Sequence, residues 1–168
     1  MSMNRNFIEV HLRGLAVSPS GGSPLALLLD HDEKRGLSIP MGPSGAADII
    51  LNMEGISQAQ LPTHDLLASI FTEGGFVLEE AAIFRRGRGP IEAHILYSRE
   101  GTQRVRDLSP SDAIALALRL KAPIFAATCL LSPSREAEES LRFASGASAG
   151  GTPAPYYYRC SNLSDSSS

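Results

Sequence analysis

Hydrophobic and polar positions along this chain fall into short segments of two kinds. Alternating or briefly apolar runs predict β-strands in seven segments, at residues 7–17, 25–30, 37–41, 76–84, 91–98, 102–108 and 122–128. Clusters of Gly, Pro and charged residues separate these segments and supply the backbone angles of turns. Pro40 is expected at a strand end or an edge, because Pro lacks the amide that a sheet ladder needs.

Two other segments have the spacing and end signals of helices. Residues 43–54 begin with Pro, which suits the first helical position, and are followed by Gly55 as a stop. Residues 61–75 predict a second helix, with Thr63 or Asp65 as its cap and a Gly pair at its end. The apolar residues expected on one face of this helix are Leu66, Leu67, Ile70 and Phe71.

A third helix is predicted after the sixth strand, in a segment that is apolar almost all round. Ser109 is the natural N-cap, and Asp112 falls at the third helical position, which makes a capping box with Asp in place of Glu or Gln. Arg119 and Lys121 suit the negative end of the helix dipole. Because few polar side chains interrupt the segment, we expect the helix to be buried on most sides.

The first and third helical segments resemble each other. Residues 43–54 and 110–121 both begin with Pro-Ser, and three predicted strands precede each of them. We infer two related halves of the form strand–strand–strand–helix around one core. The predicted fold class is therefore α+β, with mixed β-sheets and two or three core helices.

The composition changes near residue 131, where we expect the domain of residues 1–131 to end. In the remaining segment, 132–168, the first residues could form a short amphipathic helix. Gly-, Ser- and Ala-rich residues then have the composition of a flexible linker, and the Ser-rich end cannot bury enough surface to stay ordered. We therefore predict a partly disordered C-terminal tail.

Composition and charge narrow the function classes. A net charge of −3 predicts no general attraction of the whole surface to nucleic acid, although Lys occurs at positions 34 and 121 alone and the other basic residues are Arg, which suits phosphate. The two cysteines, Cys129 and Cys160, have no metal-finger spacing. No segment resembles a signal peptide or a membrane span, so we expect a cytoplasmic protein without membrane contact.

Three groups of polar residues are candidates for chemistry, and each has a plainer interpretation. Asp107 and Asp112 bracket the start of the third helix, where acids can hold a divalent cation that grips phosphate; alternatively Asp112 is only a cap. His64 beside Asp65 could act as a general base or metal ligand, or point to water beside a capping Asp. The third group, a loop that could contact phosphates or form a plain hairpin tip, contains Arg85, Arg86 and Arg88.

Three stretches resemble the bifunctional nuclease domain family. They are "LSIPMGPSGAADI" at 37–49, "LPTHDLLASIF" at 61–71 and "SPSDAIALALRLKAPIF" at 109–125, in the family's order, within a match over residues 7–131. The resemblance implies an α+β domain, a homodimer or larger assembly, a cytoplasmic location, and activity against DNA and RNA.

The family's polar positions carry over with two departures. The matched residues are His64, Asp65, Asp107, Ser111 and Asp112. Gly45 stands where the family pattern Gly-x-x-Glu-Ala has its acid, and Asp48 is the nearest substitute. Ser109 stands where the family usually has Arg.

These observations lead to a hypothesis and a rival. The hypothesis is a metal-assisted nuclease: Asp107 and Asp112 position Mg²⁺ or Mn²⁺ with Asp48 or Asp65, His64 orients or deprotonates the attacking water, and the arginine loop grips the backbone. The rival is a non-catalytic oligomeric scaffold or a module that binds a small ligand. The hypothesis requires His64, Asp65, Asp107 and Asp112 to converge.

Overall fold

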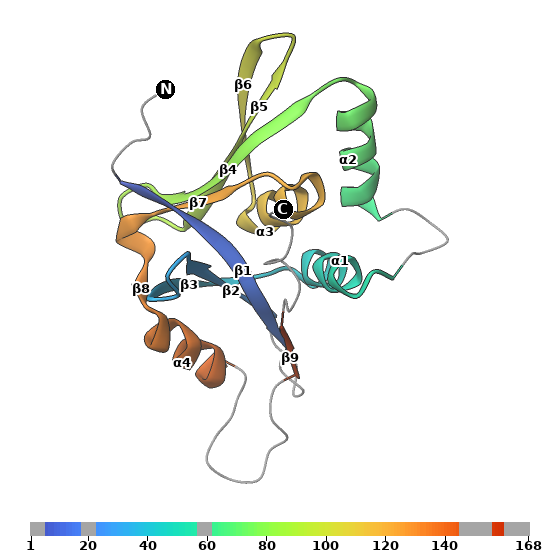
Figure 1. The fold of residues 1–168 in the computed structure, drawn as a ribbon. Helices are drawn as coiled ribbons and strands as arrows, with labels where there is room; N and C mark the ends of the chain where they lie inside the picture. The colour runs from blue at the N-terminus through green and yellow to red at the C-terminus, as the bar shows by residue number, and fades with distance from the viewer. Residues whose placement is uncertain (1–5, 18–22, 57–61, 145–155, 160–168) are drawn as a thin grey trace.

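Strands and helices of the protein form one mixed sheet with helices on both faces (Figure 1). The computed structural model describes residues 6–17, 23–56, 62–144 and 156–159. Its strands are β1 (Phe7–Val17), β2 (Leu25–Asp30), β3 (Arg35–Pro40), β4 (Val77–Arg85), β5 (Ile91–Arg99), β6 (Thr102–Leu108), β7 (Ile124–Ala127), β8 (Ser132–Pro133) and β9 (Tyr156–Arg159). Its helices are α1 (Pro43–Glu54), α2 (Thr63–Glu73), α3 (Pro110–Leu120) and α4 (Ser134–Ala144), with a 3-10 turn, η1, at Thr128–Leu130.

The sheet consists of two antiparallel meanders joined by one central strand. Its order is β6-β5-β4-β7-β1-β2-β3-β8, and β9 pairs with β1 off this path. β7 lies parallel to β4 and antiparallel to β1, so it connects the two meanders edge to edge. Each meander is followed by a helix, α1 after β3 and α3 after β6. The predicted α+β class and the two strand–strand–strand–helix halves are therefore confirmed.

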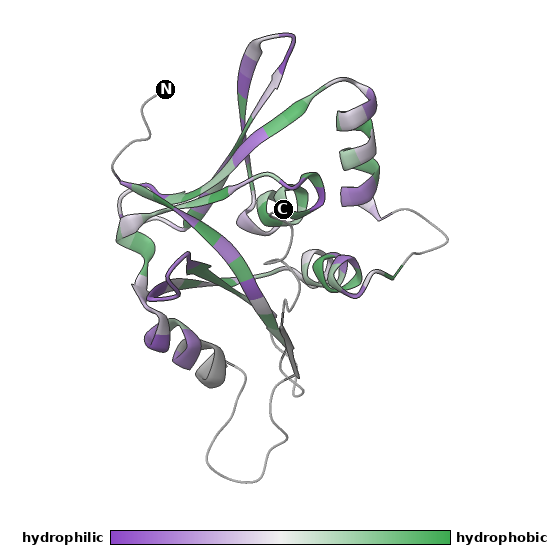
Figure 2. Ribbon diagram, viewed as in Figure 1, coloured by the Kyte–Doolittle hydropathy of each residue, from purple (hydrophilic) through white to green (hydrophobic). Residues whose placement is uncertain are grey.

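Helix α3 occupies the centre of the molecule, as its apolar sequence predicts. Its residues 113–117 are each at most 1% exposed. The sheet curves around it, so that α3 contacts β4 and β5 of one meander and also β3 of the other. In Figure 2 the helix is mostly green, whereas the first turns of α4, on the opposite side of β2 and β3, are purple. Burial of this apolar surface is the main stabilising term of the fold.

Helices α1 and α2 differ in how far the sequence predicted them. Helix α1 ends as expected at Gly55, which has the left-handed φ of 64° that Gly adopts most readily. For α2 the expected cap was wrong: Pro62 occupies the N-cap, and no side chain caps the described helix. Asp65 instead accepts a hydrogen bond from Arg119 of α3, because that buried guanidinium needs a counter-charge.

Only part of the apolar face expected for α2 packs on the core. Leu66, Leu67 and Ile70 are 49%, 39% and 53% exposed, and none of the 11 residues of α2 is fully buried. Helix α2 contacts the core through Phe71, which was expected on that face, and through Ala68, which was not. These lie on the same helical stripe as His64 and Asp65, so the packed face carries the polar residues.

The packed unit extends beyond residue 131. β8 pairs with β3 through Gly36, and α4 packs on the same strand with Ala137 at 3% exposure. The boundary expected after residue 131 therefore lies inside the sheet's own packing. The predicted linker at 145–155 and the Ser-rich end, 160–168, lie outside the described residues.

The turn between β2 and β3 is organised by a buried acid. Residues 31–35 are exposed, as a solvated charged turn should be, but Asp30 is only 5% exposed. Its carboxylate accepts hydrogen bonds from the backbone N–H groups of Lys34 (2.9 Å) and Arg35 (3.1 Å) and from Arg35 Nε (3.2 Å). Burial raises the pKa of Asp30, yet these three hydrogen bonds and the Arg35 charge together hold it below its ordinary value.

This turn predicts a specific acid sensitivity. Because the folded-state pKa of Asp30 is lowered, its contribution is present above the unfolded-state value of 3.8 and is lost as the pH falls through the folded-state value. We expect Asp30→Asn to lower the free energy of unfolding at neutral pH by about 1–2 kcal/mol. The difference in the free energy of unfolding between wild type and Asp30→Asn, measured by urea unfolding, should become smaller below about pH 4.

The matched control is Asp32→Asn, which removes an exposed acid from the same turn. It should change the free energy of unfolding by less than about 0.5 kcal/mol. A gap between Asp30→Asn and wild type that stays constant down to strongly acidic pH would contradict the role given to the Asp30 charge.

Candidate active site

His64, in the first turn of α2, contacts the second turn of α1 and the first turn of α3. Its Nδ1 atom lies 2.5 Å from Asp48 Oδ2 of α1, and its Nε2 atom lies 3.1 Å from Asp112 Oδ1 of α3. The side chains of His64 and Asp48 are 12% and 16% exposed, whereas that of Asp112 is 52% exposed. Because a carboxylate only accepts, both ring nitrogens donate when both acids are ionised, and the imidazole then carries a positive charge. The arrangement is an Asp–His–Asp bridge that is buried at one end and open at the other.

Hydrogen bonds at the start of α3 hold Asp112 in place. The Asp112 N–H donates to Ser109 Oγ (3.1 Å), which confirms Ser109 as the N-cap. The Ser109 hydroxyl donates in turn to Asp112 Oδ2 (2.7 Å), so its single proton is used. Ser111 Oγ, 3.0 Å from Ser109 Oγ, is therefore the donor of that pair. Asp112 thus serves the helix start with one oxygen and His64 with the other.

A buried arginine also links the same three helices by hydrogen bonds. Arg119 of α3 is 4% exposed; its Nε donates to Asp65 of α2, and its Nη2 donates to the backbone oxygen of Asp48 in α1 (3.1 Å). Its Nη1 has no hydrogen-bond partner among the described residues. The sequence predicted Arg119 as a cation for the helix end; the structure instead uses it as the counter-charge of Asp65.

The close contact of α1 with α3 accounts for Gly45. A Cβ atom at this position would lie 3.3 Å from the Cβ of Ser111, tighter than most packed carbon pairs. The residue where the family pattern has Glu is thus pressed against the start of α3. Asp48, the substitute that the sequence offered, is the residue whose carboxylate reaches His64.

The structure does not bring Asp107 to this bridge. Asp107 pairs with His94 across the β5–β6 ladder, and the next pair is Leu108 with Ala93. Ala93 is buried in the core that contains α3, so by the alternation of strands His94 and Asp107 point to the opposite face. Asp107 instead lies 3.9 Å from Arg86. The expectation that Asp107 and Asp112 share one cleft is wrong.

The arginine loop lies at the β4–β5 turn, as predicted, with Arg85, Arg86 and Arg88 exposed. Arg86 is engaged: it lies over the Phe84 ring at 5.2 Å and pairs with Glu92 at 3.5 Å. Arg85 and Arg86 also line a hollow of about 600 Å³ together with His94. The free thiol of Cys129 lies at its edge.

The donor atoms of the bridge do not fit a divalent cation as they stand. Both ring nitrogens of His64 and both oxygens of Asp112 are used in hydrogen bonds, and Asp107 is on the other face. Within the described ranges, no group of three or more His, Cys, Asp or Glu side chains is placed to hold a metal ion. The expected ligand set of Asp107, Asp112 and Asp48 is therefore not assembled.

Two of these features could have been recognised in the sequence. The apolar residue Leu108 had to face the core, and the strand period of two then places Asp107 on the other side. Arg119 is the one charged residue between Ala113 and Leu120, an otherwise apolar segment, and a buried cation needs a partner. The distance between His64 and Asp48 had no such signal, because it depends on how α1 and α2 pack.

Comparison with known proteins supports the same family. Residues 26–139 match the bifunctional nuclease domain. Proteins from two strains of Mycobacterium tuberculosis, both described as uncharacterized, are 32% identical to this chain over 124 residues, which is 74% of this chain and 74% of each relative. The chain belongs to the bifunctional nuclease domain family. The match reaches past residue 131 into α4, in agreement with the packing of that helix.

The sequence also led to expectations about membrane contact, assembly and cellular location. Among the helices of the described part of the chain, none has the length and apolar content needed to cross a bilayer. The homo-oligomer and the cytoplasmic location stay predictions.

The pair of Arg119 and Asp65 predicts a strong stability effect. Asp65→Ala would leave a buried guanidinium without its counter-charge, so we expect the free energy of unfolding to fall by about 3 kcal/mol, near the low end for buried pairs because Asp65 is itself one third exposed. Replacing both partners, as Asp65→Ala with Arg119→Met, should restore part of that loss. Urea unfolding of the wild type and of these two variants measures both effects.

Glu73→Ala, at the exposed end of α2, is the control and should cost less than about 0.5 kcal/mol. If the double variant is no more stable than Asp65→Ala, the loss of stability does not come from an unpaired Arg119 charge.

Proposed function

We propose that this protein is a nuclease that hydrolyses phosphodiester bonds, with His64 as its acid–base group. The observation that carries the proposal is the position of His64 between Asp48 and Asp112, in a chain whose family is named for nuclease activity. Imidazole is the side chain best suited to exchange protons near neutral pH. A carboxylate on its other nitrogen fixes its orientation, as in many acid–base sites.

The two acids have different roles in this proposal. Asp48 is a positioning residue: it is largely buried and holds Nδ1, so that Nε2 faces outward. Asp112 is half exposed and lies at Nε2, where a substrate would enter. Ser109 holds the Asp112 carboxylate by its hydroxyl and keeps it at the helix start.

The proposed step is attack of water on phosphorus. A bond forms between the water oxygen and phosphorus, and the bond from phosphorus to the leaving sugar oxygen breaks. The water proton passes to the Asp112 carboxylate, and the leaving oxygen takes up a proton from the Nε2–H group of His64 or from solvent. The products are a phosphate monoester and an alcohol, so atoms and charge balance without a further reactant.

Binding of the substrate requires cations outside the bridge. The bridge contains two carboxylates and a single imidazole ring, so its net charge is negative and repels phosphate. Arg85 and Arg88 have no ion-pair partner in the described structure, and we propose that they contribute to holding the backbone. Their contacts would make affinity depend on salt.

The experiment is a cleavage assay on single- and double-stranded DNA and RNA. It is run with Mg²⁺, with Mn²⁺ and with chelator, because the hypothesis drawn from the sequence includes a divalent cation that the donor atoms as placed do not accommodate. We expect His64→Gln to lower the cleavage rate roughly 100-fold or more, and Asp112→Asn at least roughly 10-fold. Thermal unfolding shows whether each variant remains folded.

The matched controls remove the same groups from the exposed β2–β3 turn. His31→Gln and Asp32→Asn should cleave at the wild-type rate. Equal cleavage by wild type and His64→Gln would identify a contaminant and end the proposal. The bridge would then be what the rival hypothesis requires, a structural link between three helices in a non-catalytic scaffold or binding module.

A further inference from the structure

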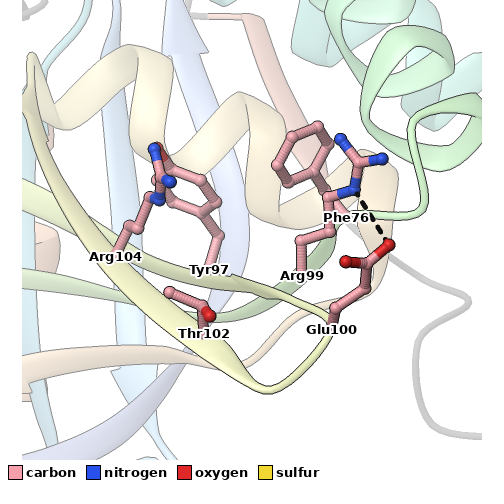
Figure 3. Close-up of a pocket in the computed structure, with 6 residues that line it drawn as sticks. All are labelled: Phe76, Tyr97, Arg99, Glu100, Thr102 and Arg104. Atoms are coloured by element: carbon pink, nitrogen blue, oxygen red, sulfur yellow. Dashed lines mark ion pairs between the residues drawn. The ribbon is translucent and has the colours of Figure 1, made fainter.

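A hollow of about 450 Å³ lies at the end of the β5–β6 hairpin (Figure 3). The residues that line it are Phe76, Tyr97, Arg99, Glu100, Thr102 and Arg104. Three aromatic rings form its base and support: Tyr97 lies 5.4 Å from Phe71 and 6.0 Å from Phe76, centroid to centroid. The hollow therefore combines partly exposed rings with cationic side chains on rigid strands.

The charge of the hollow and its surroundings is positive. Arg99 lies over the Phe76 ring at 5.2 Å and is only loosely paired with Glu100, at 3.9 Å. Arg104 is the ladder partner of Tyr97, so both side chains stand on the same face. Arg104 has no ion pair among the described residues, and the same is true of Arg106, two positions further along β6. Unpaired arginines beside aromatic rings suit a ligand with flat rings and negative charge.

The hollow is on the same sheet face as the His64 bridge. Tyr97 lies on the same face of β5 as Ile95 and Ala93, which are buried in the core that contains α3. Helix α2 connects the two places, because His64 lies in its first turn and Phe71, which supports Tyr97, lies two turns later. This is about 10 Å along the helix axis. One nucleic-acid strand of about three nucleotides, at a rise of ~3.4 Å each, spans that distance.

Strand β6 leads from the hollow to the bridge. Arg104 and Arg106 point to the same face about 7 Å apart, and the strand ends at Leu108, directly before the Ser109 cap. The arginines therefore stand between the aromatic rings and Asp112. They supply the positive charge that the negatively charged bridge lacks.

The other hollow, at the arginine loop, is less suitable for the same ligand. Its residues Phe84 and His94 contact each other with tilted rings, 5.1 Å between centroids, and His94 points to the face opposite the bridge. Arg86 there is already paired with Glu92 and Asp107.

We propose that the hollow of Tyr97 and Phe76 is a stacking site for a base of single-stranded nucleic acid, with Arg104 and Arg106 binding the phosphates that lead to the bridge. This inference rests on the proposed nuclease function, because that function requires the nucleic-acid strand to run from the hollow toward the His64 bridge. It names the substrate class as single-stranded, since a base within a duplex is already stacked on its neighbours and cannot enter the hollow.

The test measures binding apart from cleavage. Full-length protein carrying His64→Gln is titrated, in chelator, against a short labelled single strand of mixed sequence, as DNA and as RNA, and fluorescence anisotropy is recorded. Tyr97→Leu retains apolar packing but removes the stacking ring, and should weaken binding roughly 10-fold. Arg104→Gln with Arg106→Gln should weaken binding at low salt and lower the slope of log affinity against log salt by about 1.4.

Arg135→Gln is the matched control, because it removes an arginine from α4 on the opposite face. It should leave both affinity and slope unchanged. Thermal unfolding identifies any variant that fails to fold, and Tyr97→Phe, which keeps a ring, should then bind as wild type.

The outcomes separate this proposal from the nuclease function. Binding that depends on Tyr97 and Arg104 without any cleavage would support the stacking site and reject the nuclease. Cleavage with binding indifferent to these residues would overturn the stacking site alone. Tighter binding of duplex than of single strands, or self-association that the same variants abolish while oligonucleotide binding is unaffected, would also overturn it.

Discussion

The buried guanidinium of Arg119 is the interaction on which the site depends. It joins α3 to Asp65 of α2 and to the backbone of α1, deep behind the bridge of His64 with Asp48 and Asp112. Helix α2 has little apolar packing of its own and exposes its leucines. Its placement therefore depends on polar contacts, which are directional and fix geometry more sharply than apolar packing does. The same contacts hold His64 where two acids reach it.

Much of the fold could be predicted from the sequence because the physical signals are local. The strand segments alternate or are briefly apolar, and the predicted ranges 7–17, 25–30 and 102–108 coincide with β1, β2 and β6. The repeat of Pro-Ser helices after three strands correctly indicated two halves. β8 and β9 were not predicted, because a strand of two residues has no period, and the β9 segment lies in a tail of low apolar content.

The sequence indicated the three residues of the candidate bridge but not how they are arranged. His64, Asp48 and Asp112 were all candidates, and the structure brings these three together. Asp107 was chosen for its closeness in sequence to Asp112, but one residue along a strand reverses the face on which a side chain lies. Asp65 was a candidate for the helix cap and for the catalytic group, and its carboxylate pairs with Arg119. In each case the deciding fact was which elements pack together, and no local pattern encodes that.

The place of β7 has a consequence for how the chain is made. β1, near the start of the chain, and β4 are joined into one sheet by Ile124–Ala127 alone. During synthesis the first meander therefore emerges from the ribosome long before its neighbour strand exists, with one edge of β1 unpaired and its apolar face uncovered by α3. Such edges are templates for pairing with other nascent chains. We infer that the nascent polypeptide is exposed to such pairing until β7 covers Phe7–Val10 of this edge and β9 covers Gly14–Val17.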